Sequence, residues 1–204
     1  MPPKILKLDS ANPDSSLLEA ARYLSLGKVI IYPTDTIYGI GVDIGNDAAI
    51  KKVYQIKKRN IENPILILIE KQEDLLPLVK RISREAQNLI ARYWPGPLTL
   101  VFKASDKVSP LLTGRSSTIG IRCPALLQTR RLLSLTRFPL TATSANVSGQ
   151  NAVYDAKEAA NIFGDKIDLI LDSGPLVSEP STVLDVTGEK AIIIRQGKLT
   201  ISLP

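Results

Sequence analysis

The chain has 204 residues, 44% of them hydrophobic and 23% charged, which predicts a single globular domain over residues 1–204. It contains one cysteine, Cys123, and no histidine, which excludes an internal disulfide, a thiolate-cluster metal site, His-ligated zinc and nucleophiles activated by histidine. Twenty-six Lys and Arg against 20 Asp and Glu give a net charge of +6, which suits a polyanionic ligand but equally fits an ordinary basic surface.

Apolar and helical patterns alternate along the chain. Apolar spacing predicts helices at 17–24, 46–59, 83–93 and 155–163, and Pro124 is placed to start another. Apolar or alternating runs predict strands at 29–32, 65–69, 98–103, 118–122, 140–144, 169–172, 182–186 and 191–195. The run at 65–69 is apolar throughout, so we expect it in the sheet centre. Interleaved helices and strands predict an α/β fold with a twisted, mixed or antiparallel sheet.

Residues with special backbone roles mark the ends of these elements. Ser15 or Ser16 is expected to cap the first helix and Gly27 to end it. Residues 34–41 are rich in hydroxyls and glycine, so we expect a loop there. The apolar runs are too short to cross a bilayer, and the N-terminus has no leader pattern, so we expect a cytoplasmic protein without membrane contact.

Polar segments lie beside the predicted strands, where a rigid scaffold commonly holds binding groups. They are TDTIYGIG at 34–41, KKRNIENP at 57–64, TSANVSG at 143–149 and EPSTVLD at 179–185. No GxxxxGK[ST] sequence occurs, so phosphates would be bound by side-chain cations and separate backbone amides.

Cations close the second predicted helix at Lys57, Lys58 and Arg59. They could simply offset the helix dipole. They could equally bind phosphates, with Arg59 as a bidentate fork and Lys57 as a compact charge that stabilise a charged transition state. Both interpretations remain open, and the second makes Lys57 and Arg59 the candidate catalytic residues.

Alternation along 118–122 puts Thr118 and Arg122 on the same face of a strand. An arginine projecting from a sheet interior is costly unless it meets an anion. That anion could be a ligand carboxylate or an internal Asp or Glu. In TSANVSG, Ser144 and Asn146 could bind a ligand or merely form a hydrogen-bonded turn.

Taken in order, the segments PTDTIYGIG, KKRNIENPILILI, YWPGPLTLVF, TIGIRCP, PLTATSANVSGQ, EPSTVLD and IIIRQG resemble the YrdC domain family of threonylcarbamoyl-AMP synthases. The length resembles the short, single-domain bacterial branch. The resemblance implies a YrdC-like twisted sheet with flanking helices and a concave basic groove. In it, L-threonine, bicarbonate and ATP would give L-threonylcarbamoyladenylate and pyrophosphate, for N6-threonylcarbamoyladenosine beside the anticodon of tRNA.

The family's contacts map onto matching positions of this chain. ATP is implied as a substrate that carries Mg²⁺ with it, and proteins that transfer the threonylcarbamoyl group to tRNA are implied as downstream partners. The longer branch typically has histidine where Leu68 stands, so that threonine contact is not carried over. The implied threonine-binding residues are Thr36, Arg122 and Thr182, and the implied ATP-binding residues are Lys57, Arg59, Asn63, Thr118, Ser144, Asn146 and Arg195.

Two other functions fit parts of the sequence. A non-catalytic basic RNA-binding module, contacting tRNA or double-stranded RNA, is favoured by the cations at Lys51, Lys52 and 57–59. With only 5% aromatic residues, such a module would bind mostly the RNA backbone and depend strongly on salt. The resemblance also extends to the carbamoyl adenylate domain of hydrogenase maturation, whose other domains this sequence lacks.

Overall fold

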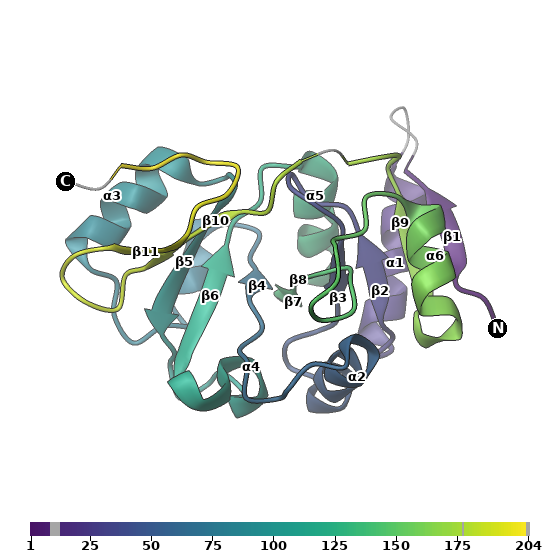
Figure 1. Ribbon diagram of the computed structural model, residues 1–204, viewed down its shortest axis with the longest axis horizontal. Helices are drawn as coiled ribbons and strands as arrows, with labels where there is room; N and C mark the ends of the chain where they lie inside the picture. Colours follow the sequence, from purple (N-terminus) through teal and green to yellow (C-terminus); the bar gives the residue numbers. More distant parts are fainter. Residues whose placement is uncertain (9–12, 177, 203–204) are drawn as a thin grey trace.

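The computed structural model describes residues 1–8, 13–176 and 178–202. Its strands form two sheets that lie side by side (Figure 1). The five-stranded sheet has the order β1-β9-β2-β3-β8, with β1 at Lys4–Lys7, β2 at Ile30–Tyr32, β3 at Gly39–Gly41, β8 at Thr143–Ser144 and β9 at Leu169–Asp172. The six-stranded sheet has the order β11-β10-β5-β6-β4-β7, with β4 at Ile67–Leu68, β5 at Leu98–Lys103, β6 at Thr118–Arg122, β7 at Leu140–Thr141, β10 at Thr182–Asp185 and β11 at Ile192–Arg195.

Both sheets mix parallel and antiparallel pairs, which confirms the predicted α/β class with a mixed sheet. The α-helices of the described residues are α1 at Asp14–Ser25, α2 at Asp47–Lys57, α3 at Arg84–Tyr93, α4 at Pro110–Thr113, α5 at Leu127–Thr136 and α6 at Ala156–Phe163. Short 3-10 turns follow at Gln72–Leu75, Gly114–Ser116 and Gly164–Lys166. None of the helices in the described ranges has the length and apolar character needed to cross a membrane.

The division into two sheets corrects the single sheet expected from the sequence. The predicted strand at 140–144 is in fact β7 and β8, which belong to different sheets. Between them, the amide of Ala142 donates to the carbonyl of Leu66 at 2.8 Å. The chain therefore crosses from one sheet to the other at Ala142, and the polar turn that follows β8 lies where the sheets meet.

Several local expectations also change. The run at 65–69 yields only β4, which is next to the edge strand β7 and not in the sheet centre. Residues 39–41 pair with β2 as a strand, so only part of 34–41 is a loop. Pro124 does not begin a helix, because α5 starts at Leu127. The first helix is preceded by Pro13 without a side-chain cap, and Ser16 instead donates to the carbonyl of Lys7.

Other helix ends form as the sequence predicts. Asn46 accepts a hydrogen bond from the amide of Ala49 at 3.0 Å, and Asp155 accepts one from Glu158 at 2.8 Å. Gly27 follows α1 with a φ of +70°, a conformation that glycine adopts without strain. These caps depend on neighbouring residues alone, which is why the sequence predicts them.

One glycine is required by the packing beneath the site. A Cβ at Gly41 would collide with the ring of Tyr32 on the adjacent strand. Tyr32 cannot move aside freely, because its hydroxyl donates to the carbonyl of Thr141 at 2.8 Å and its side chain is fully buried. This hydrogen bond connects β2 of the five-stranded sheet to β7 of the other sheet, directly before the loop that follows β2.

Candidate active site

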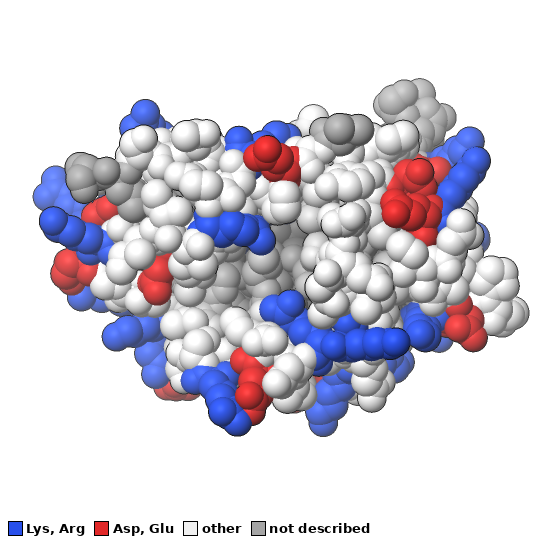
Figure 2. Space-filling model, viewed as in Figure 1, with Lys and Arg blue, Asp and Glu red and all other residues white. Residues whose placement is uncertain are grey.

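A cavity of about 440 Å³ opens where the two sheets meet. Figure 2 shows this face hollowed at its middle, with lysine and arginine side chains beside the hollow. Segments distant in sequence line it, including the loop after β2, the end of β6, the turn after β8 and the end of β11. The lining residues are Thr34, Thr36, Ile37, Tyr38, Gly39, Arg59, Pro64, Ile65, Leu66, Arg122, Ala142, Thr143, Ser144, Asn146, Gln150, Asn151, Ala152, Tyr154, Pro180, Ser181 and Arg195.

Three arginines contribute to the wall, and none of the described lining residues is acidic. Arg59 donates through Nη2 to the carbonyl of Pro64 at 2.9 Å, and Arg195 donates through Nη2 to the carbonyl of Ser181 at 2.8 Å. Burial, and then the charge of Arg122, lowers the pKa of Arg195. A cavity with this charge favours a ligand that carries several negative charges.

Arg122 is the buried member of this set. It ends β6, is only 3% exposed, and donates through Nη1 to the hydroxyl of Thr36 at 2.9 Å. Asp35 lies behind it, with Oδ1 3.8 Å from Nη2. Burial lowers the pKa of Arg122, and the charge of Asp35 opposes that effect. Of the two anions that the sequence allowed for Arg122, the internal acidic neighbour is present, and the guanidinium also lines the cavity.

The loop after β2 holds Thr36 in position. Thr34 Oγ1 donates to the carbonyl of Ile37 at 2.7 Å and accepts from the amides of Thr36 and Ile37. The hydroxyls of Thr34 and Thr36 also lie 2.9 Å apart, and either of them could be the donor in this contact. Thr36 Oγ1 accepts from Arg122, so the loop orients the guanidinium.

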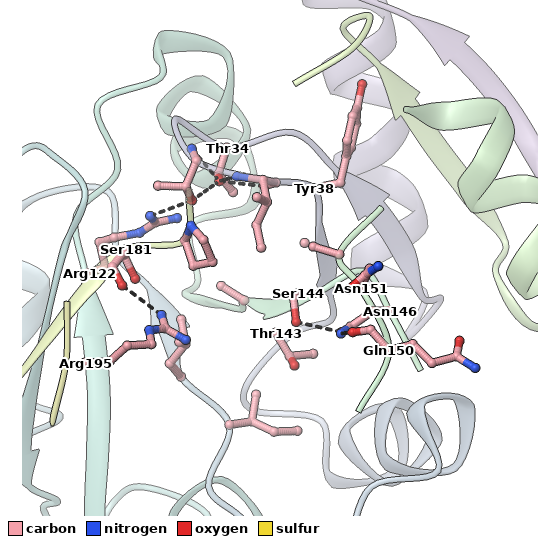
Figure 3. A pocket seen from close by; sticks show the side chains of 18 of the residues that line it. Thr34, Tyr38, Arg122, Thr143, Ser144, Asn146, Gln150, Asn151, Ser181 and Arg195 are labelled. Carbon is pink, nitrogen blue, oxygen red and sulfur yellow. Dashed lines mark hydrogen bonds between the residues drawn. The ribbon is translucent and has the colours of Figure 1, made fainter. Parts of the chain in front are cut away.

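The turn after β8 faces the two arginines Arg122 and Arg195 across the cavity (Figure 3). Ser144 Oγ donates to Asn146 Oδ1 at 2.7 Å, and the Asn146 amide group donates to the carbonyl of Gln150 at 2.6 Å. The turn is thus both a hydrogen-bonded structure, as one interpretation of the sequence held, and part of the cavity wall.

Lys57 contacts this turn from within the protein and is not among the residues that line the cavity. Its side chain is 1% exposed, and Nζ donates to the carbonyl of Ser144 at 2.5 Å, the carbonyl of Asn146 at 2.7 Å and Asn146 Oδ1 at 2.8 Å. Burial, with a smaller effect from Arg59, lowers its pKa from 10.5 to about 7. All three ammonium protons are used within the protein, so Lys57 is placed to position the turn.

The structure brings six of the predicted site residues to one cavity: Thr36, Arg59, Arg122, Ser144, Asn146 and Arg195. It does not bring Asn63, Thr118 or Thr182 there. Asn63 is exposed, Thr118 bonds Ser116 near a different surface hollow, and Thr182 is buried with its hydroxyl donated to the carbonyl of Leu199. Leu68, where a histidine contact was not carried over, is fully buried in the core.

Several polar residues of the wall were not predicted from the sequence. They are Thr34, Tyr38, Thr143, Gln150, Asn151, Tyr154 and Ser181. Most lie within or directly after the polar segments singled out above, so proximity to those segments was the available signal. Which members of a polar segment face a cavity depends on how the two sheets meet, and local sequence does not specify that.

The fold is that of an α/β protein with an arginine-lined cavity between two sheets. A family model described as Sua5_yciO_yrdC, telomere recombination, matches residues 22–197, and the chain therefore belongs to the Sua5/YciO/YrdC family. This confirms the resemblance inferred from the ordered segments.

Relatives and solved structures agree with this family. A threonylcarbamoyl-AMP synthase of Pyrococcus abyssi is 37% identical over 89% of this chain, and one of Coxiella burnetii is 36% identical over 85%. The matches cover 54% and 95% of those two proteins, so the chain spans about half the length of the first. The crystal structure of P. abyssi Sua5 complexed with L-threonine superposes with a TM-score of 0.91 at 35% identity, over 95% of this chain and 57% of that one.

Proposed function

We propose that this protein is a threonylcarbamoyl-AMP synthase, a nucleotidyltransferase that forms L-threonylcarbamoyladenylate and pyrophosphate from L-threonine, bicarbonate and ATP. The observation that carries the proposal is the set of three arginines around one cavity whose wall, as far as the structure describes it, contains no acidic residue. Charge of this kind suits the simultaneous binding of a triphosphate and a carboxylate. The names of the relatives and the threonine complex of the P. abyssi protein support the same reaction.

The reaction brings two anions together, the carbamate of threonine and the triphosphate of ATP, which repel each other. The roles proposed for the cavity residues reduce this repulsion. Arg59 and Arg195 bind phosphate oxygens of ATP, while Ser144 and Asn146 on the opposite wall orient the nucleotide. Arg122, oriented by Thr36, binds the threonine carboxylate and directs the amine. Lys57 acts through the turn it supports, since its protons are all donated to Ser144 and Asn146.

In the first step, the ammonium group of threonine gives up a proton to water, the free amine nitrogen attacks the carbon of bicarbonate, and the carbamate forms with loss of water. A carbamate oxygen then attacks the α-phosphorus of ATP. The bond between the α-phosphorus and the oxygen that bridges to the β-phosphorus breaks, and pyrophosphate is released. Arginines at the phosphates stabilise the charge that develops on this leaving group. The proton of the amine leaves with the water formed from bicarbonate, because the chain has no histidine to accept it.

Mg²⁺ would enter with ATP and not through a protein site. No described residue of the cavity wall is a carboxylate, the ligand type Mg²⁺ prefers in proteins. The metal ion would therefore be held by the phosphates themselves and by water. The product is a labile mixed anhydride, so the proposal includes cytoplasmic transfer proteins that pass the group to tRNA.

The experiment that tests the proposal is pyrophosphate release from ATP with purified protein. Release should require both L-threonine and bicarbonate, and L-serine should serve poorly in place of threonine. Pyrophosphate release that is indifferent to threonine and bicarbonate, or no release with all substrates present, would overturn the proposal. The relatives, which are named as synthases, do not favour the alternative of a non-catalytic RNA-binding module.

A further inference from the structure

Asp35 forms an incomplete ion pair with Arg122 at the edge of the cavity. The two side chains are 11% and 4% exposed, and the nearest approach, from Oδ1 to Nη2, is 3.8 Å. Neither carboxylate oxygen of Asp35 has a hydrogen-bond partner within the described residues, and neither does Nε of Arg122. Asp35 is also not among the residues that line the cavity. The carboxylate oxygens are thus buried near the arginine and outside the cavity wall.

A buried carboxylate without a hydrogen-bond partner and a buried guanidinium with an unpaired Nε are both costly. Arg122 lines the cavity and its guanidinium keeps a donor at Nε that is unpaired among the described residues, so the side chain retains hydrogen-bonding capacity for an anion. The Asp35 carboxylate meanwhile offsets the charge of that arginine while the cavity is empty. Lys198 approaches the same loop, but its Nζ donates to the backbone carbonyl of Asp35 at 2.7 Å and not to its carboxylate.

We propose that Asp35 is a specificity-determining counter-charge, which allows Arg122 to accept a carboxylate readily only when the same ligand also carries a cationic group. An amino acid meets this condition, because its ammonium group lies beside its carboxylate. A simple carboxylate does not, since it adds a second negative charge near Asp35 in surroundings where charge is weakly screened. The inference rests on the proposed function, in which Arg122 receives the carboxylate of threonine.

The effect of Asp35 comes mainly from its charge and not from its hold on the guanidinium. At 3.8 Å it makes no hydrogen bond to Arg122, whereas Thr36 makes one at 2.9 Å. Replacing Asp35 with asparagine therefore removes a charge and leaves the contact that orients Arg122 in place. The same substitution keeps the size and shape of the side chain.

Calorimetric titration with two ligands tests the inference. One is L-threonine, and the other is 2,3-dihydroxybutanoate, in which a hydroxyl replaces the ammonium group. In the wild-type protein threonine should bind more tightly. In Asp35→Asn, the Kd of dihydroxybutanoate should fall by at least about fivefold relative to that of threonine, because only the simple anion was repelled. An unchanged ratio in a variant that still binds threonine would overturn the inference.

A matched control separates charge from orientation. Thr36→Val removes the hydrogen bond to Arg122 without changing any charge, so it should weaken both ligands to a similar extent and leave their ratio within about twofold of wild type. If Thr36→Val changed the ratio as much as Asp35→Asn, orientation and not charge would set the selectivity, and the inference would be wrong.

Thermal unfolding gives a second measurement that needs no ligand. Asp35→Asn and Arg122→Gln should each lower the Tm, since each leaves one buried charge without its counterpart. The double variant should lose less than the sum of the two, because both charges are gone. If the Tm loss of the double variant equalled the sum of the two single losses, the inference about Asp35 would be wrong, while the proposed function would be unaffected. Failure of the wild-type protein to bind threonine would instead overturn the proposed function, and the unfolding result would still show whether the charges of Asp35 and Arg122 interact.

Discussion

Lys57 and Asn146 are joined by two hydrogen bonds, from Nζ to the main-chain carbonyl at 2.7 Å and to Oδ1 at 2.8 Å. A third bond from the same ammonium group reaches the carbonyl of Ser144. A side chain expected from the sequence to meet phosphate is thus engaged with the protein. The turn after β8 takes its shape from the end of α2, and the predictions for Lys57 follow from that connection.

Replacing Lys57 with methionine should impair nucleotide binding more than threonine binding. The variant keeps the apolar stem but leaves buried carbonyls at Ser144 and Asn146 without a donor, so the turn should shift. We expect the KM for ATP to rise by about tenfold or more. The Kd for threonine, measured by calorimetry without ATP, should change by less than about twofold.

Lys51→Met is the matched control, because Lys51 lies on the same helix and is exposed. It should leave the KM for ATP near the wild-type value. If Lys57→Met raised the KM for threonine and ATP equally, the lysine would be supporting the whole cavity and not the turn in particular.

The lowered pKa of Lys57 predicts a pH dependence of stability. Below about pH 7 the lysine is protonated in both the folded and the unfolded chain, and the folded state bears the full cost of burying the charge. Between about pH 7 and the ordinary lysine pKa of 10.5, the folded chain has released a proton that the unfolded chain retains, so the free energy of unfolding rises with pH. From pH 7 to pH 9 the gain from this group should be about 2 kcal/mol.

Urea unfolding of wild type and Lys57→Met at pH 7 and pH 9 measures this difference. The wild type should gain stability relative to the variant as the pH rises, while groups common to both chains cancel. Unfolding free energies that change in parallel would show that Lys57 titrates near its ordinary value and would contradict the prediction.

Arg59→Ala should slow pyrophosphate release. Arg59 is the cavity arginine at the end of the second helix, and its guanidinium is fixed by the carbonyl of Pro64. Loss of a charge that stabilises the leaving phosphates should lower kcat/KM by more than about tenfold. Arg81→Ala, at a side chain that is 73% exposed and outside the cavity wall, is the control and should have near-normal kinetics.

Arg122→Lys tests the proposed carboxylate site. Lysine keeps the positive charge but loses the planar fork that can bind a carboxylate while still donating to Thr36. The KM for threonine should rise by about tenfold while the KM for ATP stays near normal. Steady-state titrations of each substrate measure this, and an equal rise in both KM values would argue against a separate threonine subsite.

Local patterns predicted much of the secondary structure. The strands β5, β6 and β9 have the predicted bounds, because alternation and apolar runs depend on neighbouring residues. The split between β7 and β8 could not be predicted in this way. It depends on Thr143 pairing with Ile40 and Thr141 pairing with Ile67, partners far away in the sequence.

The candidate site shows the same limit. The face of Arg122 followed from alternation along β6, and the structure places it in the cavity wall. Lys57 is buried, although lysine side chains are seldom found inside a protein. It stands seven residues after Ile50 and four after Val53, on the apolar stripe of α2, so helical periodicity contained a signal that its charge obscured. Asn63 and Thr182 were assigned by resemblance alone, and neither lines the cavity.

The most direct test of the central claim is the fate of labelled bicarbonate. Purified protein would be incubated with ATP, L-threonine and ¹³C-bicarbonate, and the products would be analysed promptly by mass spectrometry. If the proposed reaction is correct, the products will include a threonine-containing adenylate that carries the ¹³C label and appears together with pyrophosphate. An adenylate without the label, or pyrophosphate without any threonine-containing adenylate, would contradict it.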